Sequence, residues 1–355
     1  MNNNRIFYLD AIRSFAIISV LLVHVSAFTQ PAIIPQYDLG PSINWWIYNF
    51  DINFFRCGVD LFLMLTGALL LGRKWEIKSF LIKKIPRIIN PFIFWTIVSS
   101  ILFVCCYGFL YFAIPPFNGV SEVINFIFTS QGIFTHYWYF WMILGVYLTI
   151  PVYNLFVSNA SQNELEYVII IWVLSSFLFF EPFIKMPNYL IYLSSPIGFV
   201  IAGYYLKNTD RKILNNPYFG LCCIFLSVLF SMLLGFIYSN SQAIAGWNRY
   251  SIFPTIESIG IFILFKNFYK FNLHFSKFNN LKNILINCVH SLAKCSYGIY
   301  LFHLIVLYLV NGVIYYSFNG RFKLWSLLLF VLTLAISWIV IAILEKIPYV
   351  KDFVT

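Results

Sequence analysis

The stretch RSFAIISVLLVHV, residues 13–25, opens on an arginine and ends one residue after a histidine, with ten apolar or small residues between them. It belongs to a longer apolar run, residues 6–28, which has the length and composition of a membrane-spanning helix. That run is too long for the apolar core of a cleavable signal peptide, so we expect it to be retained as the first span. Ionisable groups inside a span are costly, and they are usually functional or paired.

Arg13 and His24 are eleven residues apart, which is three helical turns plus about 20°, so they share one face and lie roughly 16 Å apart along the axis. Asp10 lies one turn before Arg13 and is able to pair with it. An arginine that reaches for the interface and a histidine bonded within a helix contact are each ordinary structural features. Their placement together on one face favours a function.

The composition identifies a polytopic membrane protein. Of the 355 residues, 61% are hydrophobic and only 10% are charged, where a soluble domain carries roughly 25% charged residues; the mean hydropathy is +0.80. The net charge of +10 does not indicate nucleic-acid binding, because the basic residues lie in short segments between apolar runs. The seven cysteines show no C-x-x-C spacing and lie mostly in apolar runs, so we expect neither a disulfide framework nor a metal site.

The distribution of charge predicts the topology. If the N-terminus is cytoplasmic, 18 of the 23 Lys and Arg residues fall on the cytoplasmic side and 5 on the outer side. This bias predicts ten transmembrane helices with both termini cytoplasmic, in an all-α membrane protein. The segment 119–135 is short and polar, so we expect it to be re-entrant or to lie at the interface. The ten predicted spans are 6–28, 54–72, 88–112, 137–157, 165–183, 189–206, 218–238, 250–270, 292–316 and 324–344.

About eleven residues follow the last predicted span, so we expect a single membrane domain over residues 1–355 with no appended soluble domain. The chemistry must then be carried by the membrane domain itself.

The basic residue, ten residues and histidine in the first span resemble the signature of the acyltransferase-3 membrane acyltransferases. Four further segments are similar to motifs of that family and occur in the same order, so the resemblance covers nearly the whole chain. In the second of them, Lys84-x-x-Arg87 carries a lysine where the family often has arginine, which keeps the charge without the guanidinium fork. The four segments are GVDLFLMLTGALL (58–70), KKIPRIINPFIFW (83–95), HYWYFWMILGVYLTIPVY (136–153) and SYGIYLFHLIVL (296–307).

The resemblance implies an enzyme of the stand-alone type that transfers an acyl group, usually acetyl, from cytoplasmic acetyl-CoA to a carbohydrate hydroxyl. Acetyl-CoA is then the acyl-donor substrate, and the expected acceptors are lipopolysaccharide O-antigen, capsule, exopolysaccharide or a lipid-linked sugar. It also implies a multi-pass protein of the bacterial cytoplasmic (inner) membrane. The expected partners are acetyl-CoA, the glycan acceptor and the lipid bilayer, without nucleic acid or metal.

Five residues are candidates for the reaction itself. Phosphates of CoA need fixed positive charge, which we assign to Arg13, Lys84 and Arg87. A sugar hydroxyl needs a base, and His24 is our candidate; a covalent acyl-histidine is the less favoured alternative. An acid partner would orient His24. Asp60 is the best placed, with Asp51 and Asp38 as rivals.

Other polar side chains are candidates for the acceptor site or the cavity. His136 is a candidate to bind the acceptor or to assist the base. A structural position at the membrane interface, next to an aromatic belt, accounts for this histidine equally well. Trp138 begins the same predicted helix and is a candidate for the same site. Glu257 lies in the middle of a span, with Arg249 as one possible partner. Tyr297 and His303 either line the cavity or have structural roles. We expect His274 and His290 to be incidental, and Trp45 and Trp46 to anchor the outer loop at the interface rather than to stack on sugar.

Two other classes of function compete with the enzyme. A transporter or flippase for a glycan or a small polar solute also suits ten spans with buried charges, and it would not respond to CoA. A purely structural membrane component fits poorly with the ionisable face of the first span.

Overall fold

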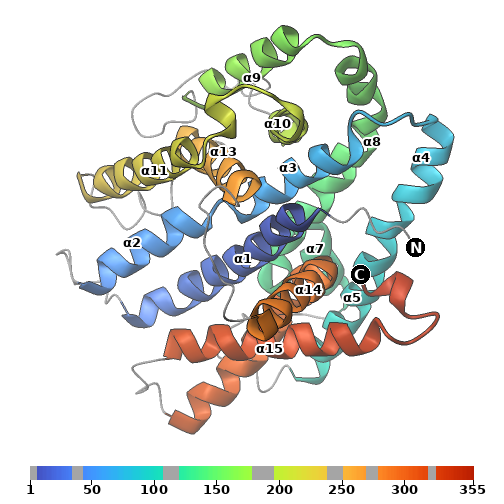
Figure 1. Cartoon of the computed structure of the whole chain (residues 1–355). Coiled ribbons are helices and arrows are strands. Elements are labelled where there is room, and N and C mark those ends of the chain that lie inside the picture. Colours follow the sequence, from blue (N-terminus) through green and yellow to red (C-terminus); the bar gives the residue numbers. More distant parts are fainter. Residues whose placement is uncertain are drawn as a thin grey trace. The chain divides into compact units, whose positions relative to one another are not determined.

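The structure, a computed structural model, describes residues 6–33, 43–106, 120–177, 196–237, 251–268, 279–318 and 325–355. Every regular element in these ranges is a helix (Figure 1), which confirms the all-α prediction for this part of the chain. Seven stretches within them are long and apolar enough to cross a membrane: Phe7–Thr29, Trp45–Leu70, Ile77–Cys105, Ser121–Asn159, Pro217–Ile237, Lys282–Val313 and Ser326–Leu344.

These seven stretches correspond to seven of the ten predicted spans. The three other predicted spans coincide with described helices of only 13 to 16 residues, whereas a crossing needs about 20 residues. The number ten and the side on which the termini lie therefore stay predictions. The three short helices are α9 (Gln162–Ser176), α10 (Pro196–Asn208) and α13 (Ile252–Asn267).

The chain forms two compact units. The first contains residues 1–74 and 152–290, and the second contains residues 75–151 and 291–355. Two of the boundaries fall inside continuous helices, after Pro151 in α8 (Trp138–Asn159) and after His290 in α14 (Asn279–Phe318).

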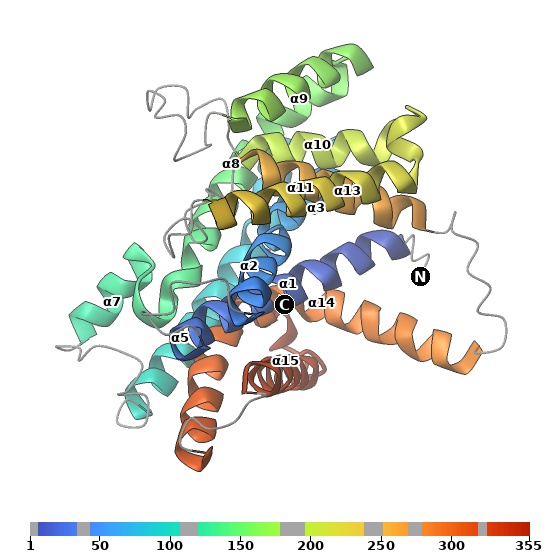
Figure 2. The same cartoon turned by 90° about the vertical axis from the view of Figure 1, so that its left-hand side faces the viewer.

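In the first unit, α3 and α10 approach each other more closely than ordinary side chains allow. A Cβ atom added at Gly67 would lie 1.7 Å from the Val200 carbonyl oxygen, and one at Gly203 would lie 1.9 Å from that of Met64. The two glycines therefore permit backbone-to-backbone contact, as small residues do between membrane helices. Elsewhere in this unit, α1 (Phe7–Ile33) packs against α2 (Ile43–Phe55) and α3 (Gly58–Leu70), and α11 (Pro217–Ile237) runs along α13 (Figure 2).

The structure corrects the prediction that residues 43–53 form an outer loop, because they form most of α2. Trp45, Tyr48 and Ile52 recur at helical spacing on one face of α2 and form a buried cluster, to which Trp46 also contributes. Trp45 is therefore a core residue rather than an anchor at the interface. The polar residues in INWWIYNFDINFF lower the mean hydropathy of the segment, so a hydropathy profile does not reveal its apolar face.

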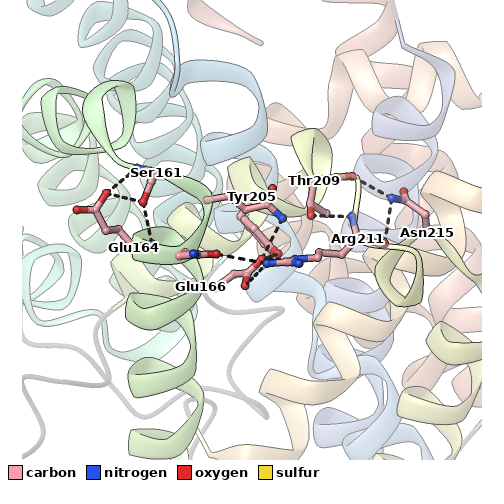
Figure 3. Close-up of polar contacts among 9 residues, drawn as sticks. Ser161, Glu164, Glu166, Tyr205, Thr209, Arg211 and Asn215 are labelled. Carbon is pink, nitrogen blue, oxygen red and sulfur yellow. Dashed lines mark hydrogen bonds and ion pairs between the residues drawn. The ribbon is translucent and has the colours of Figure 1, made fainter.

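Figure 3 shows the polar contacts that join α9 to α10 and to the connection that follows α10. Ser161 and Glu164 form a capping box at the start of α9, and the hydrogen bonds from Ser161 lower the pKa of Glu164. Arg211 binds Glu166 with two nitrogens, Nε at 2.8 Å and Nη2 at 3.0 Å. The Tyr205 hydroxyl donates to the same carboxylate at 2.5 Å. The short 3₁₀ helix η4 (Ile213–Asn215) follows Arg211.

Basic side chains also form hydrogen bonds with carbonyl groups at the ends of helices. Lys207 Nζ donates to the Ala68 carbonyl oxygen near the end of α3, and Lys266 Nζ donates to that of Leu206 near the end of α10, each at 2.7 Å. Cations at these positions compensate unpaired carbonyl groups and the negative end of the helix dipole. These lysines therefore have structural roles in addition to their part in the charge bias.

The second unit is held together partly by its C-terminal turn. Trp95 Nε1 donates to the Val354 carbonyl oxygen at 3.1 Å, and Gly298 leaves room for the same carbonyl group. The segment predicted to be re-entrant or interfacial forms a helix followed by a 3₁₀ turn. The elements of this unit, besides its parts of α8 and α14, are α4 (Ile77–Lys84), α5 (Pro86–Cys105), α7 (Val120–Thr129), η1 (Gly132–Tyr137), α15 (Trp325–Leu344) and η6 (Lys351–Phe353).

Candidate active site

The face of α1 that carries Arg13 and His24 is set by the contacts on its other faces. α1 is an unbroken helix of 27 residues, and both side chains are partly buried. Tyr8 and Phe15 make ring contacts with α13, at 6.2 Å to Phe262 and 5.7 Å to Phe265. By helical geometry Phe15 points about 170° away from the mean direction of Arg13 and His24. α13 therefore lies opposite the Arg13–His24 face.

Two neighbours flank that face within the first unit. Gly58, at the start of α3, lies against the Ala16–Val20 turn of α1, since an added Cβ would be 2.7 Å from the Ala16 carbonyl oxygen. On the other flank, Ser14 Oγ donates to the Val289 carbonyl oxygen of α14 at 2.9 Å. The Arg13–His24 face thus lies between α3 and the first part of α14.

The position of Asp51 argues against it as the partner of His24. Its carboxylate accepts a hydrogen bond from Ser26 Oγ at 3.1 Å. Ser26 is two residues from His24, so the two side chains point about 160° apart around α1. Asp60 lies two residues after Gly58, so by helical geometry its side chain points about 160° away from the side of α3 that meets α1. Its partnership with His24 stays a prediction. Asp38 lies outside the described residues.

Asp60 belongs to a buried acidic group that the sequence did not indicate as a unit. Asp60 and Glu257 are 0% and 1% exposed, and their carboxyl groups interact electrostatically between α3 and α13. The fully buried thiol of Cys57, at the start of α3, donates to the Phe54 carbonyl oxygen at 3.3 Å. The predicted acid partner and the predicted cavity residue are therefore neighbours. Arg249, the suggested partner of Glu257, lies outside the described residues.

Asp10 has a partner that sequence reasoning missed. Its Oδ2 lies 2.8 Å from His290 Nδ1, although the sequence offered Arg13 as a possible partner of Asp10 and we expected His290 to be incidental. Residues 279–291, which we assigned to a connection, are the beginning of the 40-residue helix α14. A helical reading of this stretch would have placed His290 on a regular element, but not opposite Asp10, 280 positions earlier in the chain.

The two other predicted donor-binding residues lie in the second unit, at the junction of α4 and α5. Lys84 ends α4, and its ammonium group lies 5.1 Å from the centre of the Trp75 ring, in a cation–π contact. Arg87 is exposed in the first turn of α5, directly after Pro86. Both cations are thus held at a helix junction. Their contact with a donor stays a prediction.

His136 and His303 come together in the core of the second unit. Their ring centres are 5.1 Å apart, and both side chains are buried. His136 Nε2 lies 3.0 Å from the Leu301 carbonyl oxygen, and His303 Nδ1 lies 2.7 Å from that of Tyr300. Because a carbonyl oxygen only accepts, these two nitrogens carry the protons, and in the neutral rings the other nitrogens are acceptors. This pair is able to accept a hydrogen bond from a hydroxyl group.

The neighbouring candidates have contacts of a more structural kind. The Tyr297 hydroxyl donates to the Ile88 carbonyl oxygen at 2.9 Å, which joins α14 to α5. Trp138 is partly buried at the start of α8, where its ring is 6.1 Å from that of Tyr139. Tyr300 donates to the His136 carbonyl oxygen at 2.5 Å, so it helps to fix His136. The roles of Trp138, Tyr297 and His303 towards an acceptor stay predictions.

Comparison with known proteins identifies the family. A family model described as an acyltransferase domain matches residues 6–342, a range that contains parts of both units and every candidate residue. No curated protein and no solved structure matches the chain. The matched range contains all five segments that resemble motifs of this family. The chain therefore belongs to the acyltransferase-3 family of membrane acyltransferases.

Proposed function

We propose that the protein transfers an acetyl group from cytoplasmic acetyl-CoA to a hydroxyl group of a cell-surface carbohydrate. The acceptor class is O-antigen, capsule, exopolysaccharide or a lipid-linked sugar, and the location is the bacterial cytoplasmic membrane. The observation that carries the proposal is the shared face of Arg13 and His24 on an unbroken α1, with packing contacts on its other sides. Membership of an acyltransferase family supplies the class of reaction.

His24 acts as the general base in this proposal. A sugar hydroxyl is a poor nucleophile while it holds its proton, and a neutral imidazole is able to accept that proton near pH 7. The hydroxyl oxygen attacks the thioester carbonyl carbon, the C–S bond breaks, and the CoA thiolate recovers a proton from the imidazolium. Asp60 of α3 orients the ring and stabilises its charged form.

Donor binding relies on positive charge at the cytoplasmic ends of helices. Arg13 lies about 16 Å from His24 along α1, so a phosphate held near Arg13 leaves that length for the extended pantetheine arm. Lys84 and Arg87 are proposed to contact donor phosphates as well. In this arrangement the acetyl group reaches the outer side of the membrane while CoA stays on the cytoplasmic side.

The test compares the enzyme with a transporter, using purified protein in lipid nanodiscs. We expect acetyl-CoA to raise the melting temperature, dephospho-CoA to raise it less because one phosphate is missing, and the bound acetyl group to be transferred or slowly hydrolysed. A protein that ignores acetyl-CoA in both assays, but moves a glycan or a polar solute across vesicles, would contradict the proposal and identify a transporter.

A further inference from the structure

Four buried polar groups in the second unit make no hydrogen bond with any other described residue. They are the hydroxyl groups of Thr96, Ser99 and Tyr137 and the indole N–H of Trp141, and their polar atoms are inaccessible to solvent. Roughly nine-tenths or more of such groups in proteins have a hydrogen-bond partner, ordered water included. Four exceptions in one place therefore indicate a common partner from outside the chain.

The four groups come from two neighbouring segments. Thr96 and Ser99 share one face of α5, about 60° apart around the helix, and Tyr137 and Trp141 are one turn apart, at the end of η1 and in α8. The ring of Phe92, one turn before Thr96, lies 4.9 Å from that of Tyr137 and 5.8 Å from that of Trp141. The Tyr137 hydroxyl lies near those of Thr96 and Ser99. The three hydroxyl groups therefore meet between α5 and the start of α8, with the indole N–H one turn further on.

The chemistry of this group favours a neutral ligand that carries several hydroxyl groups. Each hydroxyl of the protein donates one hydrogen bond and accepts two, whereas the indole N–H only donates. A buried water molecule typically makes about three hydrogen bonds, fewer than these four groups offer. None of the four is charged, so the group lacks the fixed positive charge that an anion requires. The Phe92 ring adds apolar surface, which is typical of sites for small molecules.

The predicted topology places the group towards the outer side of the membrane. In that topology α5 starts at the cytoplasmic side, where Arg87 lies in its first turn. Ser99 is twelve positions further on, roughly 18 Å along the axis, which is more than half of a hydrocarbon core of about 30 Å. Tyr137 begins the predicted span that enters from the outer side. A cell-surface glycan approaches from that side, opposite to the donor phosphates.

We propose that Thr96, Ser99, Tyr137 and Trp141 form a subsite that binds hydroxyl groups of the glycan acceptor other than the one that is acetylated. The inference rests on the proposed function, since it takes the acceptor as a sugar. The acceptor gains hydrogen bonds there without breaking any that the structure shows within the described part of the chain. Buried groups of this kind discriminate against analogues that lack the matching hydroxyl. The subsite thus determines which acceptors bind and takes no part in proton transfer.

The experiment measures acetyl transfer from acetyl-CoA by purified protein in nanodiscs, and the acceptor probe is unacetylated surface glycan isolated from a strain that lacks the protein. The subsite variants Y137F and T96V/S99A remove hydroxyl groups and keep the shapes of the side chains. One matched control is S100A, the adjacent serine of α5. The other is T149V, which removes a hydroxyl of α8 that donates to the Val146 carbonyl oxygen at 2.9 Å. KM and kcat for both substrates and the melting temperature are measured for each protein.

We expect the acceptor KM to rise roughly threefold to tenfold for each hydroxyl removed, the size of one hydrogen bond. The KM of acetyl-CoA and kcat should each stay within about twofold of the wild type, because only acceptor binding is weakened. The melting temperature should stay the same or rise, since a buried hydroxyl without a partner in the protein costs stability. Both controls should keep the acceptor KM of the wild type.

An acceptor KM that is unchanged in both subsite variants overturns the inference, and a fall in melting temperature alongside it shows that the group binds water only. An equal rise in the KM of both substrates also decides against the subsite, because it indicates a general disturbance of the fold. If Y137F yields no folded protein, T96V/S99A alone decides. Absence of transfer by the wild type refutes the proposed function and the subsite with it, so the two failures are distinguishable.

Discussion

At the scale of single residues, the carboxyl groups of Asp60 and Glu257 are both buried and interact with each other. Both are almost completely inaccessible, and each contributes to the electrostatic surroundings of Cys57. Two like charges in a medium of low dielectric repel strongly if both groups are ionised. Such a pair avoids this repulsion when one of the two carboxyl groups keeps its proton.

This argument predicts that E257Q changes the free energy of unfolding by less than about 1 kcal/mol, because the amide is neutral, as one carboxyl group of such a pair must be, and has nearly the same volume. The measurement is thermal unfolding in detergent, followed by intrinsic fluorescence. The matched control is E345Q, which makes the same change where Lys294 pairs with the carboxylate, and which should lose up to about 1 kcal/mol. A loss of stability in E257Q larger than that in E345Q would show that an ionised Glu257 stabilises the fold, against this argument.

The residues of the site were predictable to different degrees. The shared face of Arg13 and His24 follows from helical spacing alone, and the structure retains it in an unbroken α1. Their partners were not predictable, because contacts such as Asp10–His290 join positions 280 residues apart in the chain. Spacing determines which side chains share a face, whereas tertiary packing determines what that face meets.

At the scale of helices, the contact of α3 with α10 depends on the absence of side chains at Gly67 and Gly203. We predict that G67A destabilises the protein by about 1–3 kcal/mol, because the added methyl group would overlap the Val200 carbonyl group and force the helices apart. Melting temperature and the yield of monodisperse protein report the effect. G145A is the matched control, since nothing lies within 4 Å of a Cβ atom at that glycine of α8; a loss of stability in G145A as large as that in G67A would exclude close helix packing as the cause.

Helix existence was easier to predict than helix extent. α2 was missed because Asn49, Asp51 and Asn53 interrupt its apolar pattern, although the two asparagines are buried and hydrogen-bonded in the structure. The length of α14 was underestimated because its first turns are polar. Both errors arise because hydropathy reports contact with lipid, whereas polar helical segments gain their stability from packing and hydrogen bonds that only the fold provides.

At the scale of the whole molecule, the apolar composition correctly predicted a membrane protein whose described residues form helices as their regular structure, and the family match confirms the acyltransferase assignment. The division into two units was not predictable from hydropathy, because two of its boundaries lie within continuous helices, at Pro151 and after His290. The positive charges served as a guide to topology, yet Lys207 and Lys266 also bind helix-end carbonyl groups. Charge counting cannot separate these two uses.

The central claim is that His24 activates the acceptor hydroxyl, and the most direct measurement is transfer of labelled acetyl from acetyl-CoA to the surface glycan in membranes. We expect H24A to lose transfer by roughly a hundredfold or more while its Kd for acetyl-CoA stays within about twofold, since no donor phosphate contact is removed. The control S26A removes the hydrogen bond to Asp51 on the opposite face of α1 and should retain most of the transfer. Wild-type transfer by H24A would contradict the account.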